Sequence, residues 1–160
     1  MKIAIASDHR GFSMKECIKT IVSELGHNYV DFGSFDDCPV DYPDMAYAAA
    51  VAVTKKEVDR AIMVCSVGTG MCIAANKVKG IRAVLCHDEL NAKISRTHNN
   101  ANVLCLAGDF VDEQELQKMI QVWLNTEFCG GRHQRRIKKI TAIEEGRDPR
   151  IDNILRSNVT

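Results

Sequence analysis

One segment, residues 61–77, limits what this chain can fold into more than any other. Its first part, Ala61-Ile62-Met63-Val64-Cys65, is apolar and contains β-branched side chains, which predicts a buried strand. A turn with two glycines follows at 66–70, and the alanine-rich residues 71–77 favour a helix. A strand, a Gly-rich turn and a helix in this order direct backbone N–H groups and a helix N-terminus at one point, where an anion is stabilised.

Cys65 lies where this strand ends and the turn begins. In an open parallel sheet, ligands bind at that edge. The segment alone has two interpretations. One is a tight turn in which Cys65 is a small buried apolar side chain. The other is an anion hole beside a reactive thiolate, which a helix N-terminus stabilises. The rest of the chain decides between them.

Length and composition limit the class of protein. The chain has 160 residues, enough for one domain with a proper core. Its 21 basic and 21 acidic residues give a net charge of zero, so nothing indicates a nucleic-acid partner. No apolar segment reaches the length of a membrane span, and the first residues lack the pattern of a signal peptide. The seven cysteines include no C-x-x-C pair, which indicates reduced thiols in a cytoplasmic protein rather than disulfides or a metal site.

Apolar runs alternate with helical patterns along most of the chain. Strands are expected at 2–7, 29–32, 61–65, 81–86 and 102–106, and helices at 12–25, 45–54, 71–77, 88–97 and 113–124. Asp44 and Asp112 are suitable N-caps for two of these helices. The alternation predicts an α/β protein: a three-layer Rossmann-like fold with a five-stranded parallel sheet, right-handed crossovers and helices on both faces.

The chain changes character after Gly130-Gly131. Residues 132–140 are strongly basic, and a thin apolar edge predicts a helix there, a C-terminal helical extension. Arg132 and Arg136 are four residues apart and share one face of such a helix. They belong either to a solvated charge run or to a clamp of two guanidinium groups on a phosphate. A typical basic run is solvated, and the glycine hinge before these arginines strengthens the case for the clamp.

The last part of the chain is a polar tail, residues 146–160. Its residues Ile151, Ile154 and Leu155 are spaced for a short amphipathic helix. We expect a single domain over 1–145, followed by this tail, which packs on the body or on a partner subunit.

Other polar residues lie next to predicted strands. Asp8-His9 follows the first strand, at the edge where ligands bind, which gives this pair more weight than a lone histidine. His98-Asn99 precedes the last strand and therefore lies at the opposite edge, from which a site on a neighbouring subunit is reached most easily. Tyr42, in an irregular loop, is either a buried aromatic residue or a lid over a ligand.

Several motifs occur together along the chain. They are Ser7-Asp8-His9, Val40-Asp41-Tyr42-Pro43-Asp44, Cys65 with Ile73-Ala74-Ala75-Asn76-Lys77, Gly80-Ile81-Arg82-Ala83, Ser95-Arg96 with His98-Asn99-Asn100-Ala101-Asn102-Val103, and Gly130-Gly131-Arg132-His133 with Arg136. In order and spacing, across residues 1 to about 145, they resemble the type B ribose-5-phosphate isomerases and their relatives, the galactose-6-phosphate isomerase subunits. Each motif alone is a weak signal, but the set is specific.

The resemblance implies an enzyme that interconverts ribose 5-phosphate and ribulose 5-phosphate through an enediolate, without a metal ion or another cofactor, in the non-oxidative branch of the pentose phosphate pathway. It implies that Cys65 is the base that moves a proton between C1 and C2. The amides of residues 66–70 would hold the enediolate oxygen. His98, with Asp8, would open the sugar ring.

The resemblance also implies which groups hold the substrate. His9, Arg132 and Arg136 would bind the phosphate, and Asn99 would bond sugar hydroxyls. A homodimer, sometimes a tetramer, would draw each site from both subunits, which explains how a histidine at the far edge serves the base. The expected substrate-binding residues are Asp8, His9, Tyr42, Ser66, Val67, Gly68, Thr69, Gly70, Asn99, Asp109, Arg132 and Arg136.

The chain departs from the family pattern at two positions. The family's loop reads Cys-Gly-Thr-Gly-x-Gly, whereas Val67 here replaces the threonine beside the base, and Ser66 or Thr69 is left to supply the hydroxyl. Asp109 stands where many members have an arginine of the phosphate site, and an acid repels phosphate unless it is paired or turned away. One branch uses a glutamate base at the position of Met71, which methionine cannot replace.

Other functions remain open from the sequence. One is isomerisation of a six-carbon sugar phosphate, such as allose or galactose 6-phosphate, which depends on the space around the loops. Another is a sugar-phosphate-binding protein that has lost catalysis, suggested by Val67 and Asp109, although the retained Cys65, His98 and Asn99 argue against it. A thiol-redox role lacks a nearby resolving-cysteine motif.

Overall fold

The computed structural model describes residues 1–150 and contains a five-stranded sheet of parallel strands in the order β2-β1-β3-β5-β4. The strands are β1 (Lys2–Ser7), β2 (Asn28–Asp31), β3 (Arg60–Cys65), β4 (Ala83–Leu85) and β5 (Val103–Ala107). The helices are α1 (Phe12–Glu24), α2 (Tyr42–Thr54), α3 (Thr69–Ala75), α4 (Glu89–Asn99), α5 (Glu113–Asn125) and α6 (Arg132–Glu144). The predicted α/β architecture is confirmed.

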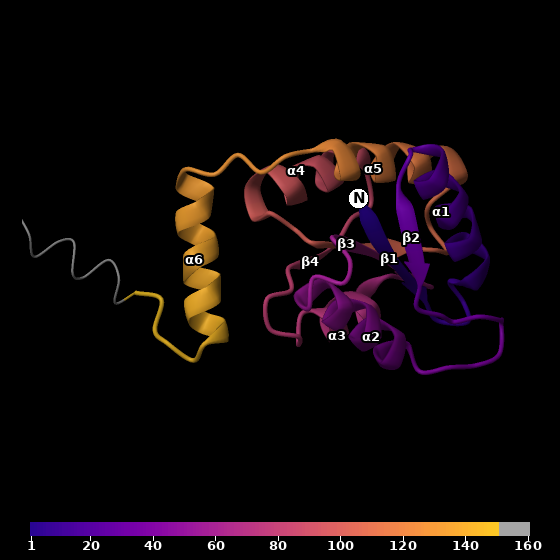
Figure 1. Ribbon diagram of the computed structural model, residues 1–160, viewed down its shortest axis with the longest axis horizontal. Helices are drawn as coiled ribbons and strands as arrows, with labels where there is room; N and C mark the ends of the chain where they lie inside the picture. The colour runs from indigo at the N-terminus through magenta and orange to yellow at the C-terminus, as the bar shows by residue number, and fades with distance from the viewer. Residues whose placement is uncertain (151–160) are drawn as a thin grey trace, which may run out of the picture. The chain divides into compact units, whose positions relative to one another are not determined.

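The sheet is the middle of three layers, with α2 and α3 on one face and α1, α4 and α5 on the other (Figure 1). Strand side chains alternate between the two faces because successive residues of a strand point to opposite sides. The face toward α2 and α3 carries small side chains, such as Ala4, Ala61 and Cys65. The other face carries larger ones, such as Ile62 and Leu104. Cys65 therefore points to the α2–α3 side of the sheet.

Most predicted elements are confirmed to within a few residues, and α2 shows the largest difference. The helix begins at Tyr42 with Asp41 in the N-cap position, so the prediction that Asp44 caps it is wrong. A proline fits the first turn because a helix leaves its first N–H groups unpaired and proline has none. Asp112 caps α5 as predicted and accepts the N–H of Glu115 at 2.9 Å.

A buried lysine orders the loop that follows β2. Lys15 of α1 is fully buried, and its Nζ donates to both carboxylate oxygens of Asp31 at 2.7 Å and to Ser34 O at 2.6 Å. Burial raises the pKa of Asp31, but the hydrogen bonds from Lys15 and from the N–H of Gly33 outweigh it and hold that pKa below its usual value. The loop is joined to the end of β1, since Ser34 N donates to Ser7 O at 2.6 Å. The ion pair thus holds this loop beside the carboxyl end of β1.

The chain divides into two compact units, Met1–Phe128 and Cys129–Thr160. In the second unit, α6 confirms the helix predicted after the two glycines. The short helix predicted near Ile154 lies outside the described residues. The assignment of residues 1–145 to one domain stays a prediction.

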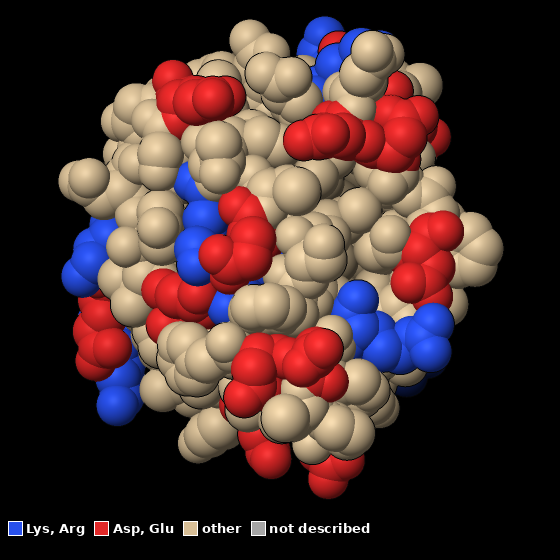
Figure 2. Space-filling view, turned by 90° about the vertical axis from the view of Figure 1, so that its right-hand side faces the viewer, with Lys and Arg blue, Asp and Glu red and all other residues tan. Residues whose placement is uncertain are grey.

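Charged side chains of both signs are mixed on the face of the molecule shown in Figure 2. On this face, Lys and Arg side chains lie among Asp and Glu side chains. A nucleic-acid-binding surface is instead dominated by basic residues. Among residues 1–150, no helix is both long enough and apolar enough to cross a membrane.

The turn between β3 and α3 requires a glycine at position 68. Gly68 occupies the N-cap position of α3 with a φ of +71°. A Cβ there would lie 2.4 Å from Leu85 Cδ1 and 2.8 Å from Leu106 O, both too close for a carbon atom. The turn therefore lies tightly against β4 and β5, which determines the path of the chain after Cys65.

We expect Gly68→Ala to lower the free energy of unfolding by at least about 3 kcal/mol, because it adds a backbone clash to the strain of a positive φ. Gly26→Ala is the matched control. Gly26 also has a positive φ, of +77°, but its added Cβ would meet nothing within 4 Å, so the expected loss is about 1 kcal/mol. Urea unfolding followed by circular dichroism measures both. Equal losses would contradict the tight contact of Gly68 with β5.

Candidate functional site

Two loops flank a switch point at the carboxyl edge of the sheet. The crossover from β1 leads to β2 on one side, and the chain after β3 continues to β4 and β5 on the other. Open α/β sheets bind ligands at such a point. The flanking loops are residues 8–11 after β1 and 66–68 after β3, the second of which leads into α3. A Cβ on Gly11 would lie 2.4 Å from Val64 O, so the first loop lies directly against β3.

Main-chain hydrogen bonds hold Cys65 at this edge. Cys65 is the last residue of β3 and is 5% exposed. Its carbonyl oxygen accepts the N–H of Gly108 at 2.8 Å, and the carbonyl oxygen of Ser66 accepts the N–H of Asp109 at 3.0 Å. The turn after β5 therefore holds the turn after β3, together with the thiol at its start. The prediction that Cys65 ends a strand at the carboxyl edge of the sheet is confirmed.

The loop after Cys65 leads into α3, which begins at Thr69. Among residues 1–150, no side chain caps the first turn of α3, so its first N–H groups lack the acceptor that a cap supplies. The hydroxyl of Thr69 lies 3.5 Å from Val67 O, which is long for a hydrogen bond. The side chain of Val67 is 45% exposed. The loop thus keeps amide and hydroxyl donors that an oxyanion needs.

Asp8 and His9 shape the loop after β1. Asp8 is buried, and its Oδ1 accepts the N–H of Gly11 at 2.9 Å. The N–H of Val40 donates to His9 Nδ1 at 3.3 Å. Because Nδ1 is the acceptor of this bond, the neutral imidazole carries its proton on Nε2. His9 therefore offers an N–H donor on its other side.

Tyr42 contacts the first turn of α3, directly after the loop that follows β3. A Cβ on Gly70 would lie 2.7 Å from Tyr42 Cζ, so the ring lies directly on this glycine. Tyr42 is 41% exposed and is therefore not a buried core residue. The structure brings it to the predicted loop, and its role as a lid stays a prediction.

Asp109 pairs with side chains from both neighbouring loops. Its Oδ2 accepts a hydrogen bond from Ser66 Oγ at 2.5 Å and one from Arg10 Nη2 at 2.9 Å. The Ser66 hydroxyl, and then the Arg10 guanidinium, hold the pKa of Asp109 below its usual value. The acid that was expected to repel a phosphate unless paired is therefore paired. Sequence reasoning missed Arg10, because its partner follows a strand whose place in the sheet no local pattern reveals.

The structure does not bring His98 and Asn99 to Cys65. Both residues end α4, and β5 starts a few residues later. In the register of the sheet, β5 starts opposite Ala61 and ends opposite Cys65. A strand segment of this length separates the two edges by about 13 Å. The thiol and the histidine thus lie at opposite edges of the sheet in one chain, as the topology predicts.

Buried arginines fix the end of α4. Arg96 donates to Ala101 O, just after the helix, and to Thr126 O at 3.2 Å. Its guanidinium lies 5.9 Å from the centroid of the Trp123 ring, and that of Arg60 lies 5.3 Å from the same ring. Burial lowers the pKa of Arg96 to about 10, which leaves it charged at neutral pH. These contacts hold the last turn of α4, and with it the predicted histidine, in one position.

Arg132 and Arg136 both lie in α6, four residues apart and so on one side of the helix. α6 belongs to the second compact unit, Cys129–Thr160. The assignment of the two arginines to a phosphate stays a prediction.

Cys72, in α3, is an acidic thiol. Cys72 packs against the core cluster between the sheet and α2, in agreement with its interpretation as a core residue. A hydrogen bond with Cys105 lowers the pKa of Cys72 to about 7, although burial opposes the shift. The same contact and burial raise the pKa of the fully buried Cys105. A thiol reagent therefore has to be tested on Cys72 as well as on Cys65.

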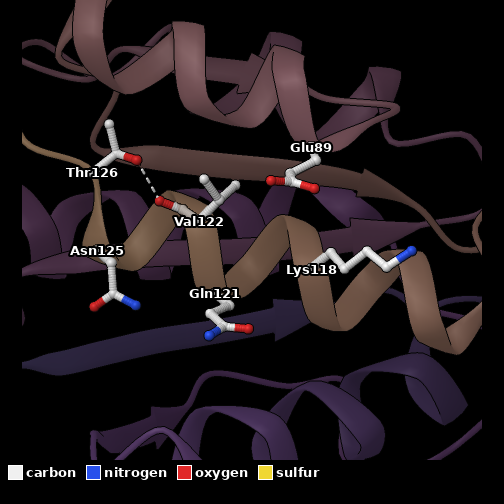
Figure 3. Close-up of a pocket in the computed structure, with 6 residues that line it drawn as sticks. All are labelled: Glu89, Lys118, Gln121, Val122, Asn125 and Thr126. Atoms are coloured by element: carbon white, nitrogen blue, oxygen red, sulfur yellow. Dashed lines mark hydrogen bonds between the residues drawn. The ribbon is translucent and has the colours of Figure 1, made fainter.

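A groove of about 370 Å³ lies along α4 and α5, lined by Glu89, Lys118, Gln121, Val122, Asn125 and Thr126 (Figure 3). Within it, Thr126 donates its hydroxyl to Val122 O at 2.6 Å. Neither a cysteine nor a histidine lines this groove. It therefore offers no thiol or imidazole for proton transfer, unlike the loops at the carboxyl edge.

The chain is similar to a known protein family along most of its length. The family model described as Ribose/Galactose Isomerase matches residues 3–140. Ribose-5-phosphate isomerase B of Escherichia coli (strain K12) is 42% identical to this chain over 147 residues, which are 92% of this chain and 99% of that protein.

Solved structures show the same similarity. Ribose-5-phosphate isomerase B of Clostridium thermocellum is 43% identical, with a TM-score of 0.90 over 91% of this chain and 99% of that chain. Ribose-5-phosphate isomerase B of Mycoplasma genitalium, solved with bound ribulose-5-phosphate, is 44% identical, with a TM-score of 0.85 over 90% of this chain and 96% of that chain.

Proposed function

This chain belongs to the ribose/galactose isomerase family, and we propose that it interconverts ribose 5-phosphate and ribulose 5-phosphate. The observation that carries the proposal is Cys65, a thiol at the carboxyl end of β3 followed by the uncapped start of α3. The relative that binds ribulose-5-phosphate supports the choice of a pentose phosphate.

The reaction only relocates hydrogen. The thiolate of Cys65 removes the proton from C2 of the open-chain aldose, the electron pair forms the C1–C2 double bond, and the aldehyde oxygen becomes negative. The N–H groups of residues 66–70 stabilise this oxygen. Cys65 then returns its proton to C1, the C2 hydroxyl loses its proton as C2 becomes the carbonyl, and the oxygen on C1 gains one. No metal ion or electron acceptor is needed.

Ring opening needs a second acid–base group, which we assign to His98 acting with Asp8. Because His98 lies at the amino edge of its own sheet, it would serve the Cys65 of a second copy. The proposed enzyme is a homodimer, or a tetramer built from it. Each site combines Cys65 of one subunit with His98 of the partner subunit and Asn99 of the partner subunit, which bonds sugar hydroxyls.

Three side chains are assigned to the phosphate. His9 offers its Nε2–H, since Nδ1 already accepts the N–H of Val40. Arg132 and Arg136 share one side of α6 and form a clamp of two guanidinium groups, which matches the geometry of phosphate oxygens.

The proposed reaction places the protein in the non-oxidative branch of the pentose phosphate pathway. We expect it in the cytoplasm. Its seven cysteines are free thiols, which suits a reducing compartment.

The direct test is an assay of the purified protein with ribose 5-phosphate and, in parallel, allose 6-phosphate, with and without a chelator. Pentose turnover that the chelator does not change supports the proposal. Turnover of the hexose phosphate alone would replace the substrate and keep the mechanism. Binding of both without turnover would indicate a sugar-phosphate-binding protein. The relatives named ribose-5-phosphate isomerase B favour neither alternative.

We expect Cys65→Ala to lower kcat at least about 1,000-fold and to leave the Kd for ribose 5-phosphate within about threefold, because the variant lacks the base but keeps the binding groups. Steady-state kinetics and calorimetry measure the two quantities. Cys72→Ala is the matched control, since Cys72 is a nearby thiol with a pKa lowered to about 7. Its kcat should stay within about twofold. Near-wild-type turnover by Cys65→Ala would remove Cys65 from the mechanism.

A mixed dimer tests the shared site. Cys65→Ala and His98→Asn should each be inactive alone, but a refolded mixture should regain about a quarter of wild-type activity, because half of the dimers are mixed and each contains one intact site. Differently tagged chains allow the mixed dimer to be purified and assayed. A mixed dimer without activity would show that the site is not shared between subunits.

We expect Arg136→Ala to raise KM for ribose 5-phosphate about tenfold or more while changing kcat less, because a guanidinium binds the phosphate equally in the ground state and the transition state. Arg135→Ala removes the adjacent charge from a different side of α6 and should leave KM within about twofold. Steady-state kinetics compare the two. An unchanged KM for Arg136→Ala would exclude it from the phosphate site.

A further inference from the structure

Three residues are linked through their side chains at the carboxyl edge of the sheet, and the proposed function assigns no role to these side chains. Arg10 follows β1, Ser66 follows β3 and Asp109 follows β5, and these three strands are neighbours. Asp109 Oδ2 accepts Ser66 Oγ at 2.5 Å and Arg10 Nη2 at 2.9 Å. The group therefore borders the same loops as Cys65.

The direction of these hydrogen bonds determines what the group offers to a ligand. A carboxylate has no proton to donate, so the hydroxyl of Ser66 donates to Asp109 and remains available only as an acceptor. Both bonds to Asp109 end on Oδ2, and within residues 1–150 its Oδ1 accepts no hydrogen bond. The side chain of Asp109 is 37% exposed. The group thus presents two acceptors, Asp109 Oδ1 and Ser66 Oγ.

The group carries no net charge and so gives a phosphate no net attraction. Arg10 and Asp109 form an ion pair whose charges cancel, and one N–H of the guanidinium is engaged by the carboxylate. A ligand that fits two acceptors brings hydrogen-bond donors. On a sugar phosphate the donors are the hydroxyl groups.

We infer that Asp109 recognises a hydroxyl of the sugar chain, that Ser66 supports this contact, and that Arg10 is a specificity-determining residue that orients the carboxylate and cancels its charge. The inference rests on the proposed function. In that reaction the oxygens on C1 and C2 lie at the Cys65 loop and C5 carries the phosphate. The recognised hydroxyl is therefore the one on C3 or the one on C4 of the open chain.

The test pairs protein variants with substrate analogues. Asp109→Ala should lower kcat/KM for ribose 5-phosphate about 30-fold, the range of a hydrogen bond to a charged group. It should lower kcat/KM by less than about threefold for the 3-deoxy or the 4-deoxy analogue, whichever lacks the recognised hydroxyl. A purely structural role would lower kcat/KM equally for all three substrates. Equal losses would overturn the inference, and Asp109→Asn, which keeps the shape of the side chain, provides a second variant.

Arg10 has its own test. Arg10→Ala leaves the carboxylate uncompensated near the phosphate, so KM for ribose 5-phosphate should rise about fivefold, and more at low salt, because salt screens the repulsion. Arg10→Lys keeps the positive charge, so its KM should stay close to that of the wild-type chain. Glu57→Ala, which removes an exposed carboxylate at the other edge of the sheet, should leave kcat/KM unchanged. An unchanged KM for Arg10→Ala would overturn the role of Arg10.

The behaviour of the wild-type chain distinguishes a failure of this inference from a failure of the proposed function. If the wild-type chain binds ribose 5-phosphate without isomerising it, the proposed reaction fails. The same variants and analogues are then compared by their Kd, measured by calorimetry, which shows whether Asp109 contacts a sugar hydroxyl. If the wild-type chain does not bind the sugar phosphate, both are overturned.

Discussion

The candidate site depends on the main-chain hydrogen bonding of β3 between β1 and β5. Because the three strands are parallel, their carboxyl ends lie at one edge, and the turns that follow them come together there. The ladder continues past the strands, since the N–H of Gly108 binds the carbonyl of Cys65. A slip of β3 by one residue would move the thiol to the opposite face of the sheet, toward α1, α4 and α5. The chemistry of the edge thus requires this register.

Features that depend on neighbouring residues could be predicted from the sequence, and features that depend on strand order could not. Cys65 was placed at the end of a strand because the apolar run and the glycine turn are local. The cap of α2 was predicted wrongly because Asp44 has the chemistry of a cap, whereas Pro43 already lies inside the helix. The pairing of Arg10 with Asp109 joins turns that are 99 positions apart, and only the order β1-β3-β5 brings them together.

His98, at the amino edge of the sheet, shows the same difference between local features and features that depend on the tertiary structure. Its location before β5 follows from the alternation of strands and helices, but the contacts that hold it do not. The guanidinium groups of Arg60 and Arg96, from β3 and α4, both lie near the ring of Trp123, 5.3 Å and 5.9 Å from its centroid. No periodicity predicts such a contact, because each partner alone is an ordinary residue of its own element. The side chains that position a functional group are therefore harder to predict than the group itself.

The separation of Cys65 and His98 has a consequence for the amount of protein present. Under the proposed function, a solitary copy carries two halves of different sites and no complete one. Once dilution separates the copies, the number of complete sites falls with the square of the protein concentration. The rate of isomerisation then depends steeply on the expression level. At low concentration, a fully folded chain has almost no activity.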